Sequence, residues 1–158
     1  MKKINLNKKD KYVLVDDEDF TFLNKFKWKY WDCGHGKAYA ARQLYRKNTV
    51  KTILMHREIL NMGKEFSVDH VNGDGLDNQK RNLRVCLHKE NMRNRKINKN
   101  NTSGFKGVYP YKYGWTAQIK VNGKTKRLGS SKNIIDLAKR YDQAAIKYFG
   151  EFARLNFA

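Results

Sequence analysis

Residues 67–91 read SVDHVNGDGLDNQKRNLRVCLHKEN, and this stretch decides the fold of the central part of the chain. A short apolar start leads to Asp69 and His70, and a loop rich in Gly, Asp and Asn follows. Residues 82–85 then predict a second strand, and a helical segment is expected from about His88. The predicted order is therefore strand, loop, strand, helix.

The same stretch carries groups suited to hydrolysing a phosphodiester bond. Such hydrolysis needs a base that activates water and a cation that stabilises charge on the phosphate. Histidine suits the first task near neutral pH, and carboxylate or amide oxygens suit Mg²⁺. His70 follows Asp69 directly, and Asn82 and Asn91 stand twelve and twenty-one residues after that histidine. The alternative interpretation is a surface hydrogen bond between Asp69 and His70, beside a loop of ordinary turn-forming residues.

This set of residues and spacings resembles the HNH (ββα-metal) nuclease family. It is similar in particular to the phage and intron-encoded homing endonucleases that carry Asn in the last position. The resemblance implies that His70 is the general base and that Asp69 and Asn91 hold one divalent cation. It also implies that Asn82 braces the loop and orients the histidine. The expected cofactor is Mg²⁺, with Mn²⁺ as the alternative.

The charge of the chain favours a nucleic-acid partner. Thirty-four Lys and Arg stand against fifteen Asp and Glu, which gives a formal charge of +19 and a pI near 10.0. The basic residues are spread along the whole chain, and such a field attracts polyanions. We expect double-stranded DNA as the partner. A ribosome-associated or RNA-binding protein is the alternative, although the chain has no known RNA-reading pattern.

The sequence predicts a cytoplasmic protein, located in the host cytoplasm if a phage encodes it. No run approaches the roughly 18 apolar residues of a membrane span, and the N-terminus lacks the apolar core of a secretory signal. The two isolated cysteines, Cys33 and Cys86, suit a reducing compartment better than a disulfide scaffold. We expect no membrane contact and no obligate protein partner.

An α+β fold is expected for the whole chain. The predicted divisions are a nuclease domain over 1–98, a linker over 99–104 and a second domain over 105–158. Within the first domain, a β-rich supporting region (1–60) precedes the nuclease core (61–98). Its expected elements are a strand at 12–15, a hairpin turn at 33–36 and a strand running into a short helix over 52–60. A helix capped by Asp16 or Asp17 is also expected, with one apolar face formed by Phe20, Phe22, Leu23 and Phe26. His56 matches a histidine common upstream of the core in homing enzymes, and phosphate contact and packing are both open for it.

The C-terminal domain is expected to contain three strands and one helix. The strands are predicted at 105–111, 115–121 and 125–129, and the helix runs over 133–149 before Gly150. Alternation along the middle strand turns one set of side chains toward the helix: Trp115, Ala117, Ile119 and Val121. The opposite face carries Thr116, Gln118 and Lys120, joined from the flanking strands by Lys106 and Arg127.

Residues 103–158 resemble the plant ethylene-response-factor (apetala-two type) DNA-binding domain. The matching segments are Phe105-Lys106-Gly107-Val108, residues 115–119, Arg127-Leu128-Gly129, residues 138–145 and Leu155-Asn156-Phe157. The resemblance implies that the sheet lies in the major groove of DNA. On this sheet the expected DNA contacts are Lys106, Tyr109, Tyr111, Gln118, Lys120 and Arg127. The first strand carries tyrosines where the plant proteins carry several Arg, so we expect a looser sequence preference.

Two basic residues that follow Asn91 complete the set of expected DNA contacts. Arg93 and Arg95 lie close after the predicted metal ligand, where they would bind phosphate, and solvated surface charge is the alternative. The whole pattern predicts a site-specific DNA endonuclease of the homing type, borne by a phage or another mobile element. The alternative function is a non-catalytic DNA-binding regulator whose nuclease core has decayed.

Overall fold

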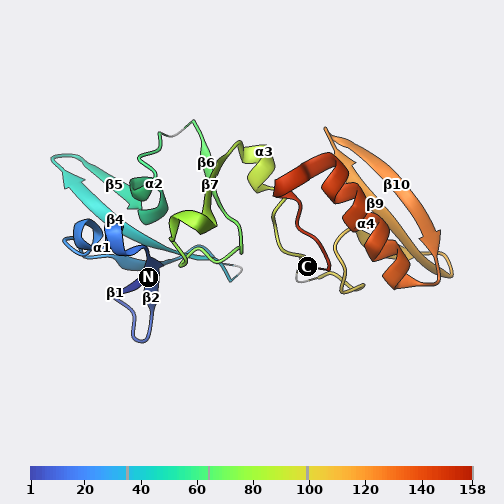
Figure 1. The fold of residues 1–158 in the computed structure, drawn as a ribbon, viewed down its shortest axis with the longest axis horizontal. Coiled ribbons are helices and arrows are strands. Elements are labelled where there is room, and N and C mark those ends of the chain that lie inside the picture. Colours follow the sequence, from blue (N-terminus) through green and yellow to red (C-terminus); the bar gives the residue numbers. More distant parts are fainter. Residues whose placement is uncertain (35, 64, 99, 158) are drawn as a thin grey trace. The chain divides into compact units, whose positions relative to one another are not determined.

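The computed structural model describes residues 1–34, 36–63, 65–98 and 100–157. The chain forms two compact units, Met1–His88 and Lys89–Ala158, called here the N-terminal and C-terminal units (Figure 1). Both combine helices with small antiparallel sheets, so the predicted α+β fold class is confirmed. Within the described residues, no helix has the length and apolar character needed to span a membrane. Of the predicted linker over 99–104, Lys99 lies outside the described residues.

The N-terminal unit begins with a hairpin and a three-stranded sheet. Its first elements are β1 (Lys2–Asn5), β2 (Tyr12–Val15), α1 (Asp17–Leu23), β3 (Lys29–Asp32), β4 (Ala38–Arg46), β5 (Thr49–Leu54) and α2 (Met55–Ile59). Strands β1 and β2 pair with each other, and the larger sheet has the order β3-β4-β5. The predicted strand at 12–15, the hairpin and the strand-to-helix segment are confirmed. Strand β1 was not predicted, because its lysine-rich sequence carries little hydrophobic alternation.

A single hydrophobic core joins these elements. Its buried members are Ile4, Leu6, Val13, Val15, Leu23, Trp28, Ala40 and Met55. The polar N–H of the buried Trp28 is also hydrogen-bonded, since its indole Nε1 donates to the Leu23 carbonyl at 2.9 Å. An indole that buries its ring and pairs its N–H contributes large apolar area without an unsatisfied donor. The core therefore fixes α1 and the first hairpin against the three-stranded sheet.

The predicted N-cap residue of the first helix is confirmed in its position, but it makes no capping hydrogen bond. Helix α1 begins at Asp17, and Asp16 occupies the N-cap position without a side-chain hydrogen bond to the helix. Its carboxylate instead accepts from the Lys80 backbone N–H at 2.7 Å, far along the sequence. Asp16 thus makes a tertiary contact to the segment that includes the candidate site, and local sequence rules do not detect this contact.

The segment that includes the candidate site has the predicted order. It comprises β6 (Ser67–His70), the 3-10 helix η1 (Lys80–Asn82), β7 (Leu83–Cys86) and α3 (His88–Asn91). Asn82, which was expected in the second strand, ends η1 one residue before that strand begins. The loop between β6 and η1 lies against β2, because the Leu14 N–H donates to the Leu76 carbonyl and the Leu14 carbonyl accepts from Asn78, both at 2.8 Å. The first hairpin therefore positions the site loop.

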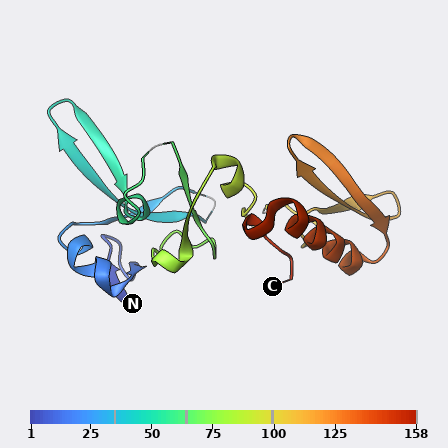
Figure 2. The same cartoon turned by 45° about the horizontal axis from the view of Figure 1, so that its top comes forward.

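The C-terminal unit is a three-stranded antiparallel sheet with one long helix on it (Figure 2). Its elements are β8 (Val108–Tyr111), β9 (Gly114–Val121), β10 (Lys124–Ser131), α4 (Ile134–Phe149) and η2 (Gly150–Phe152), with the sheet order β10-β9-β8. The Asn133 side chain accepts from the backbone N–H groups of Ile135 and Asp136, which caps α4. Gly150, at a φ of 54°, ends the helix. The predicted helix and hairpins are confirmed, but the first strand starts at Val108, three residues later than predicted.

Close packing joins the chain before β8 to the helix and the C-terminal tail. Gly107 has a φ of 77°, and a Cβ there would lie 1.9 Å from the Tyr141 ring, so only glycine fits. The buried Asp142 accepts from the backbone N–H groups of Asn156 and Phe157 at 2.9 Å. The Asn156 side chain in turn accepts from the Lys106 N–H at 2.6 Å. The tail is thereby tied to the start of the sheet.

Candidate active site

Strand β6 places Asp69 and His70 side by side in the N-terminal unit. It pairs with β7 in antiparallel register, with Asp69 opposite Arg84 and His70 opposite Leu83. Both side chains are buried, at 4% exposure for Asp69 and 6% for His70. Successive side chains of a strand point to opposite faces, so the carboxylate and the imidazole meet different neighbours.

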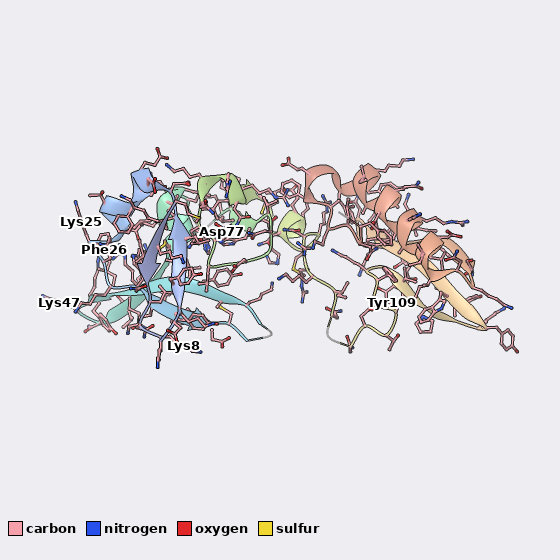
Figure 3. The ribbon with its side chains drawn as sticks, turned by 60° about the horizontal axis from the view of Figure 1, so that its bottom comes forward. Lys8, Lys25, Phe26, Lys47, Asp77 and Tyr109 are labelled. Carbon is pink, nitrogen blue, oxygen red and sulfur yellow. The ribbon has the colours of Figure 1, made fainter. Side chains whose placement is uncertain are left out.

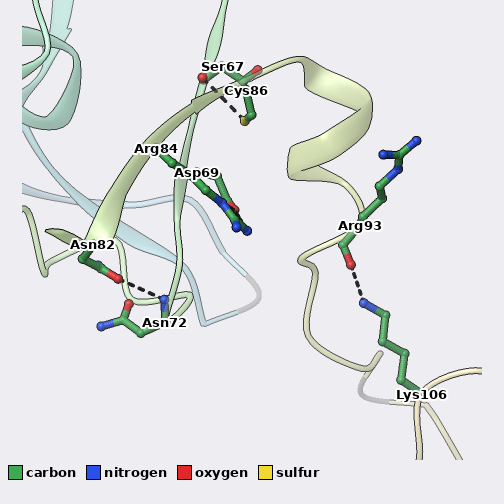
Figure 4. A network of polar contacts seen from close by, with 8 residues as sticks. All are labelled: Ser67, Asp69, Asn72, Asn82, Arg84, Cys86, Arg93 and Lys106. Carbon is green, nitrogen blue, oxygen red and sulfur yellow. Dashed lines mark hydrogen bonds and ion pairs between the residues drawn. The ribbon is translucent and has the colours of Figure 1, made fainter. Parts of the chain in front are cut away.

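The Asp69 carboxylate is paired with an arginine across the ladder. The Arg84 guanidinium donates to Oδ2 from Nε at 2.9 Å and from its terminal nitrogen at 2.6 Å (Figure 4). Both side chains of this ion pair are largely buried. A cation bound to Asp69 would therefore share the carboxylate with a fixed positive charge. This partner follows from the strand register, and sequence reasoning missed it.

The His70 imidazole is enclosed by two rings and an amide. Its Nε2 lies 2.9 Å from the Oδ1 atom of Asn78. The His56 ring meets it edge-on at 5.0 Å between centroids, and the Tyr39 ring lies at 5.8 Å. Burial lowers the pKa of His70, and this effect is opposed by the Asn78 hydrogen bond and the charge of Asp69. A neutral imidazole near pH 7 is the form that can accept a proton.

Asn82 acts on the loop and not on the histidine ring. Its Oδ1 accepts from the Asn72 backbone N–H at 3.0 Å (Figure 4). Its Nδ2 donates to the Asp77 carbonyl at 2.7 Å. These two bonds span the loop between β6 and η1. Loop bracing is the first of the two roles that the HNH resemblance implies for Asn82. The side chain that meets the His70 ring is Asn78.

The acidic residues of the loop are engaged in turn contacts. Asp74 accepts from the Leu76 N–H at 2.9 Å. Asp77, labelled in Figure 3, accepts from the side-chain amides of Asn72 at 2.9 Å and Gln79 at 2.7 Å. In the described ranges 1–34, 36–63, 65–98 and 100–157, no group of three or more His, Cys, Asp or Glu side chains is arranged to hold a metal ion.

His56 is packed inside the N-terminal unit. It is 5% exposed and its Nδ1 has no hydrogen-bond partner within the described residues. Burial, with smaller contributions from His70 and Arg57, lowers the pKa of His56 to about 3. The ring is therefore neutral at any working pH, and a phosphate contact through it would be a hydrogen bond without a charge.

The remaining residues predicted near the metal belong to the C-terminal unit. Asn91 is the last residue of α3 and is half-buried. The Arg93 guanidinium lies over the Phe149 ring, 4.8 Å from its centroid, while Arg95 is exposed. The roles of these three residues, as metal ligand and phosphate contacts, stay predictions.

Lys106 has an unexpected position before the first strand of the sheet. Its Nζ donates to the carbonyls of Arg93 at 2.5 Å and Arg95 at 2.8 Å. Burial, followed by the charges of Arg154 and Arg95, lowers the pKa of Lys106 to about 8. Its ammonium thus holds the chain that follows α3, beside a hollow of about 450 Å³. A DNA contact by Lys106 stays a prediction.

The other predicted DNA-contact residues share one face of the sheet. Val108, Ala117 and Ile119 point into the core, so alternation turns their neighbours to the face opposite α4. That outer face carries Tyr109, Tyr111, Gln118, Lys120 and Arg127, which we call the outer sheet face. Arg127 stands opposite Gln118 in the register, and its guanidinium lies 4.5 Å from the Tyr111 ring centroid and bonds Ser130. Figure 3 shows Tyr109 beside this sheet.

Comparison with curated proteins gives the family. Protein 3.8 of Escherichia phage T7 is 32% identical to the chain over 93 residues, which cover 58% of this chain and 76% of that protein. The chain belongs to the Protein 3.8 family. It is also 25% identical over 149 residues to the uncharacterized HNH endonuclease L560 of Acanthamoeba polyphaga mimivirus, covering 94% of this chain and 76% of that protein. No protein-family model matches the chain, and no solved structure matches it.

This member of the Protein 3.8 family is thus distantly related to an HNH endonuclease, which suggests a nuclease with DNA as its substrate. Three residues of its site went unrecognised in the sequence: Tyr39, Asn78 and Arg84. Arg84 could have been found from the strand pairing, since it faces Asp69 once the register is known. Asn78 and Tyr39 carry no such signal, because they meet His70 through tertiary contacts.

Proposed function

We propose that this protein is a metal-dependent DNA endonuclease of the HNH type. The observation that carries the proposal is the buried imidazole of His70, which lies directly after Asp69 at the end of β6 and beside a braced loop. Burial lowers the pKa of this imidazole, which favours the neutral form that a general base requires. The distant relation to an HNH endonuclease points to the same chemistry.

The chemistry of the two expected ligands suits a hard cation. The Asp69 carboxylate and the Asn91 amide offer oxygen ligands, which Mg²⁺ prefers, and water and a DNA phosphate would complete its coordination. When bound, such a cation would act as a Lewis acid and stabilise charge on the phosphate and the leaving oxygen. A cluster of several acidic ligands is not required for a single cation bound in this way.

In this proposal each of the protein's own groups has one role. His70 removes a proton from the attacking water. The Arg84 guanidinium limits the free movement of the Asp69 carboxylate through two hydrogen bonds. Arg93 and Arg95 bind the phosphate backbone. The outer sheet face docks in the major groove and brings the nuclease core to a chosen site, in the manner of a homing enzyme.

A plasmid-nicking assay tests the proposed function. Purified full-length protein is incubated with supercoiled DNA in the presence of Mg²⁺, of Mn²⁺, or of a chelator. We expect conversion to nicked or linear DNA with either metal and none with the chelator. Cleavage that survives the chelator would contradict the one-metal mechanism.

A non-catalytic DNA-binding regulator is the second candidate. The observation in its favour is the Asp69–Arg84 ion pair, which engages the proposed metal ligand. A regulator would protect a discrete DNA site in a footprinting experiment without any divalent cation. It would also leave that site intact when Mg²⁺ or Mn²⁺ is added.

A further inference from the structure

Asn78 occupies an unusual position for a turn residue. Its side chain is completely buried, at 0% exposure. Its backbone N–H donates to the Leu14 carbonyl at 2.8 Å, so strand β2 fixes the position of the Asn78 backbone. Turn-forming asparagines are commonly exposed and bond their own backbone a few residues away. The buried side chain of Asn78 instead points away from such local contacts.

Only one of the two polar atoms of the Asn78 side-chain amide has a hydrogen-bond partner among the described residues. Its Oδ1 lies 2.9 Å from His70 Nε2, while its Nδ2 has no hydrogen-bond partner among the described residues. Burying an amide N–H without an acceptor is unfavourable. For packing alone, an apolar side chain of similar size would serve better. The polar group at this position is therefore explained by its contact with His70.

We infer that Asn78 is a positioning residue for the proposed reaction, whose amide oxygen accepts the Nε2 proton of His70 and so leaves the basic lone pair on Nδ1. The inference rests on the proposed function, since it concerns the same histidine. A neutral imidazole has one donor and one acceptor nitrogen, and a fixed hydrogen bond to one of them selects the tautomer.

The surrounding rings restrict the orientation of the His70 imidazole, on which this tautomer depends. The edge of His56 and the ring of Tyr39 lie within 5.8 Å of the His70 centroid and enclose the imidazole. A turn of the ring about its bond to Cβ would have to pass these neighbours. The ring orientation and the proton position are thereby set together.

Asn78 and Asn82 have separate tasks in this arrangement. Asn82 bonds the loop backbone at Asn72 and Asp77 and so holds the loop that leads to Asn78. Asn78 then holds the imidazole. The orienting role that the HNH resemblance implies for Asn82 reaches His70 through this second asparagine.

The test combines nitrogen NMR of the imidazole with cleavage kinetics. Full-length protein labelled at histidine nitrogen is examined without metal, at a pH where the ring is neutral, and His70 is assigned by its loss in His70→Gln. The variants are Asn78→Leu, which lacks an acceptor, and Asn78→Asp, which keeps an oxygen in place. We expect an Nε2–H ring in the native chain and in Asn78→Asp, and a mixture of tautomers in Asn78→Leu.

In the cleavage assay, Asn78→Leu should lower kcat by about 10- to 100-fold without changing KM for DNA, and Asn78→Asp should restore most of the rate. A native ring protonated on Nδ1 would overturn the inference, as would an Asn78→Leu variant with native tautomer and native kcat. If Asn78→Leu fails to fold, the inference is tested by the tautomer of His70 in the native chain and in Asn78→Asp, which should be Nε2–H in both. If the NMR result is as expected and no DNA is cleaved, the proposed function fails and the positioning by Asn78 stands.

Discussion

Burial controls the chemistry of single residues in the N-terminal unit. His56 and His70 are both nearly inaccessible, and their rings lie 5.0 Å apart. Burial lowers the pKa of both groups, and the pKa of His56 falls to about 3. Two neutral imidazoles in contact avoid the repulsion that two charged ones would have. The same burial makes the stability of the protein depend on pH.

The stability of the folded protein is expected to fall as the pH decreases below the pKa of a free histidine. His56 has a folded pKa of about 3 and an unfolded value of 6.5, so between these values only the unfolded chain binds its proton. The free energy of unfolding therefore decreases as pH falls from 6.5 toward 3, by up to about 1.4 kcal/mol per pH unit from this group. Urea unfolding at several pH values should show this slope in the native chain and a smaller one in His56→Phe. An unchanged slope in His56→Phe would refute the assignment, and the exposed His88→Ala serves as the control.

The Asp69–Arg84 pair is expected to contribute to stability. Arg84→Leu removes two hydrogen bonds to a carboxylate that is 4% exposed. Breaking a largely buried ion pair costs about 3 kcal/mol, and the partial exposure of Arg84 keeps the loss at the lower end of the usual range. Denaturant unfolding measures the change. Arg81→Leu, at an exposed arginine, is the matched control. If Arg84→Leu lowers the free energy of unfolding no more than Arg81→Leu does, the Asp69–Arg84 pair contributes little to stability.

At the residue scale, the sequence predicted Asp69 and His70 as neighbours on a strand because spacing along the chain carries that information. The partners Asn78, Tyr39 and Arg84 depend on how the loop folds back against β2 and β4. An asparagine in a Gly- and Asp-rich loop has the same sequence pattern whether it is exposed or completely buried. The contact with His70 thus required the three-dimensional structure.

The sheet and helix of the C-terminal unit show how local rules act at the scale of elements. Alternation along β9 correctly separates core residues from the outer sheet face. The start of the helix near Asn133 and its stop at Gly150 were predicted from the sequence, because the signals at helix ends depend on residues within one turn. Strand β1 and the role of Asp16 were not readable, since both depend on partners distant along the chain.

Removing the helix cap should destabilise the C-terminal unit. Asn133→Ala deletes the oxygen that accepts from two backbone N–H groups at the start of α4. The expected loss is about 1 kcal/mol in the free energy of unfolding, measured by thermal or denaturant unfolding. Asn133→Ser keeps a capping oxygen and should lose little. Equal losses in the two variants would show that the cap does not stabilise the helix.

Basic residues of the outer sheet face should set part of the salt dependence of DNA binding. The double variant Lys120→Ala and Arg127→Ala removes two expected phosphate contacts. The slope of log K against log salt concentration should become less negative by about 2, because each contact contributes about 0.9. Fluorescence anisotropy with a DNA duplex measures it. Lys139→Ala with Lys147→Ala, on the exposed surface of α4, is the matched control, and equal effects of both pairs would argue against the outer sheet face.

At the scale of the whole molecule, charge and chemistry favour the same partner. The formal charge of +19 attracts polyanions, of which DNA is one, and lysines such as Lys8, Lys25 and Lys47 extend from the surface of the N-terminal unit (Figure 3). Such charge promotes binding to any nucleic acid without selecting a sequence. Hydrolysis, the reaction proposed for the candidate active site in the N-terminal unit, would supply the step that binding alone does not.

The most direct test of this account compares two histidine variants in the plasmid-nicking assay with Mg²⁺. His70→Ala removes the proposed general base, and His88→Ala removes an exposed histidine at the start of α3. We predict that His70→Ala loses cleavage activity by about 100-fold or more while it still binds DNA, and that His88→Ala cleaves at the native rate. Native cleavage by His70→Ala would contradict the account.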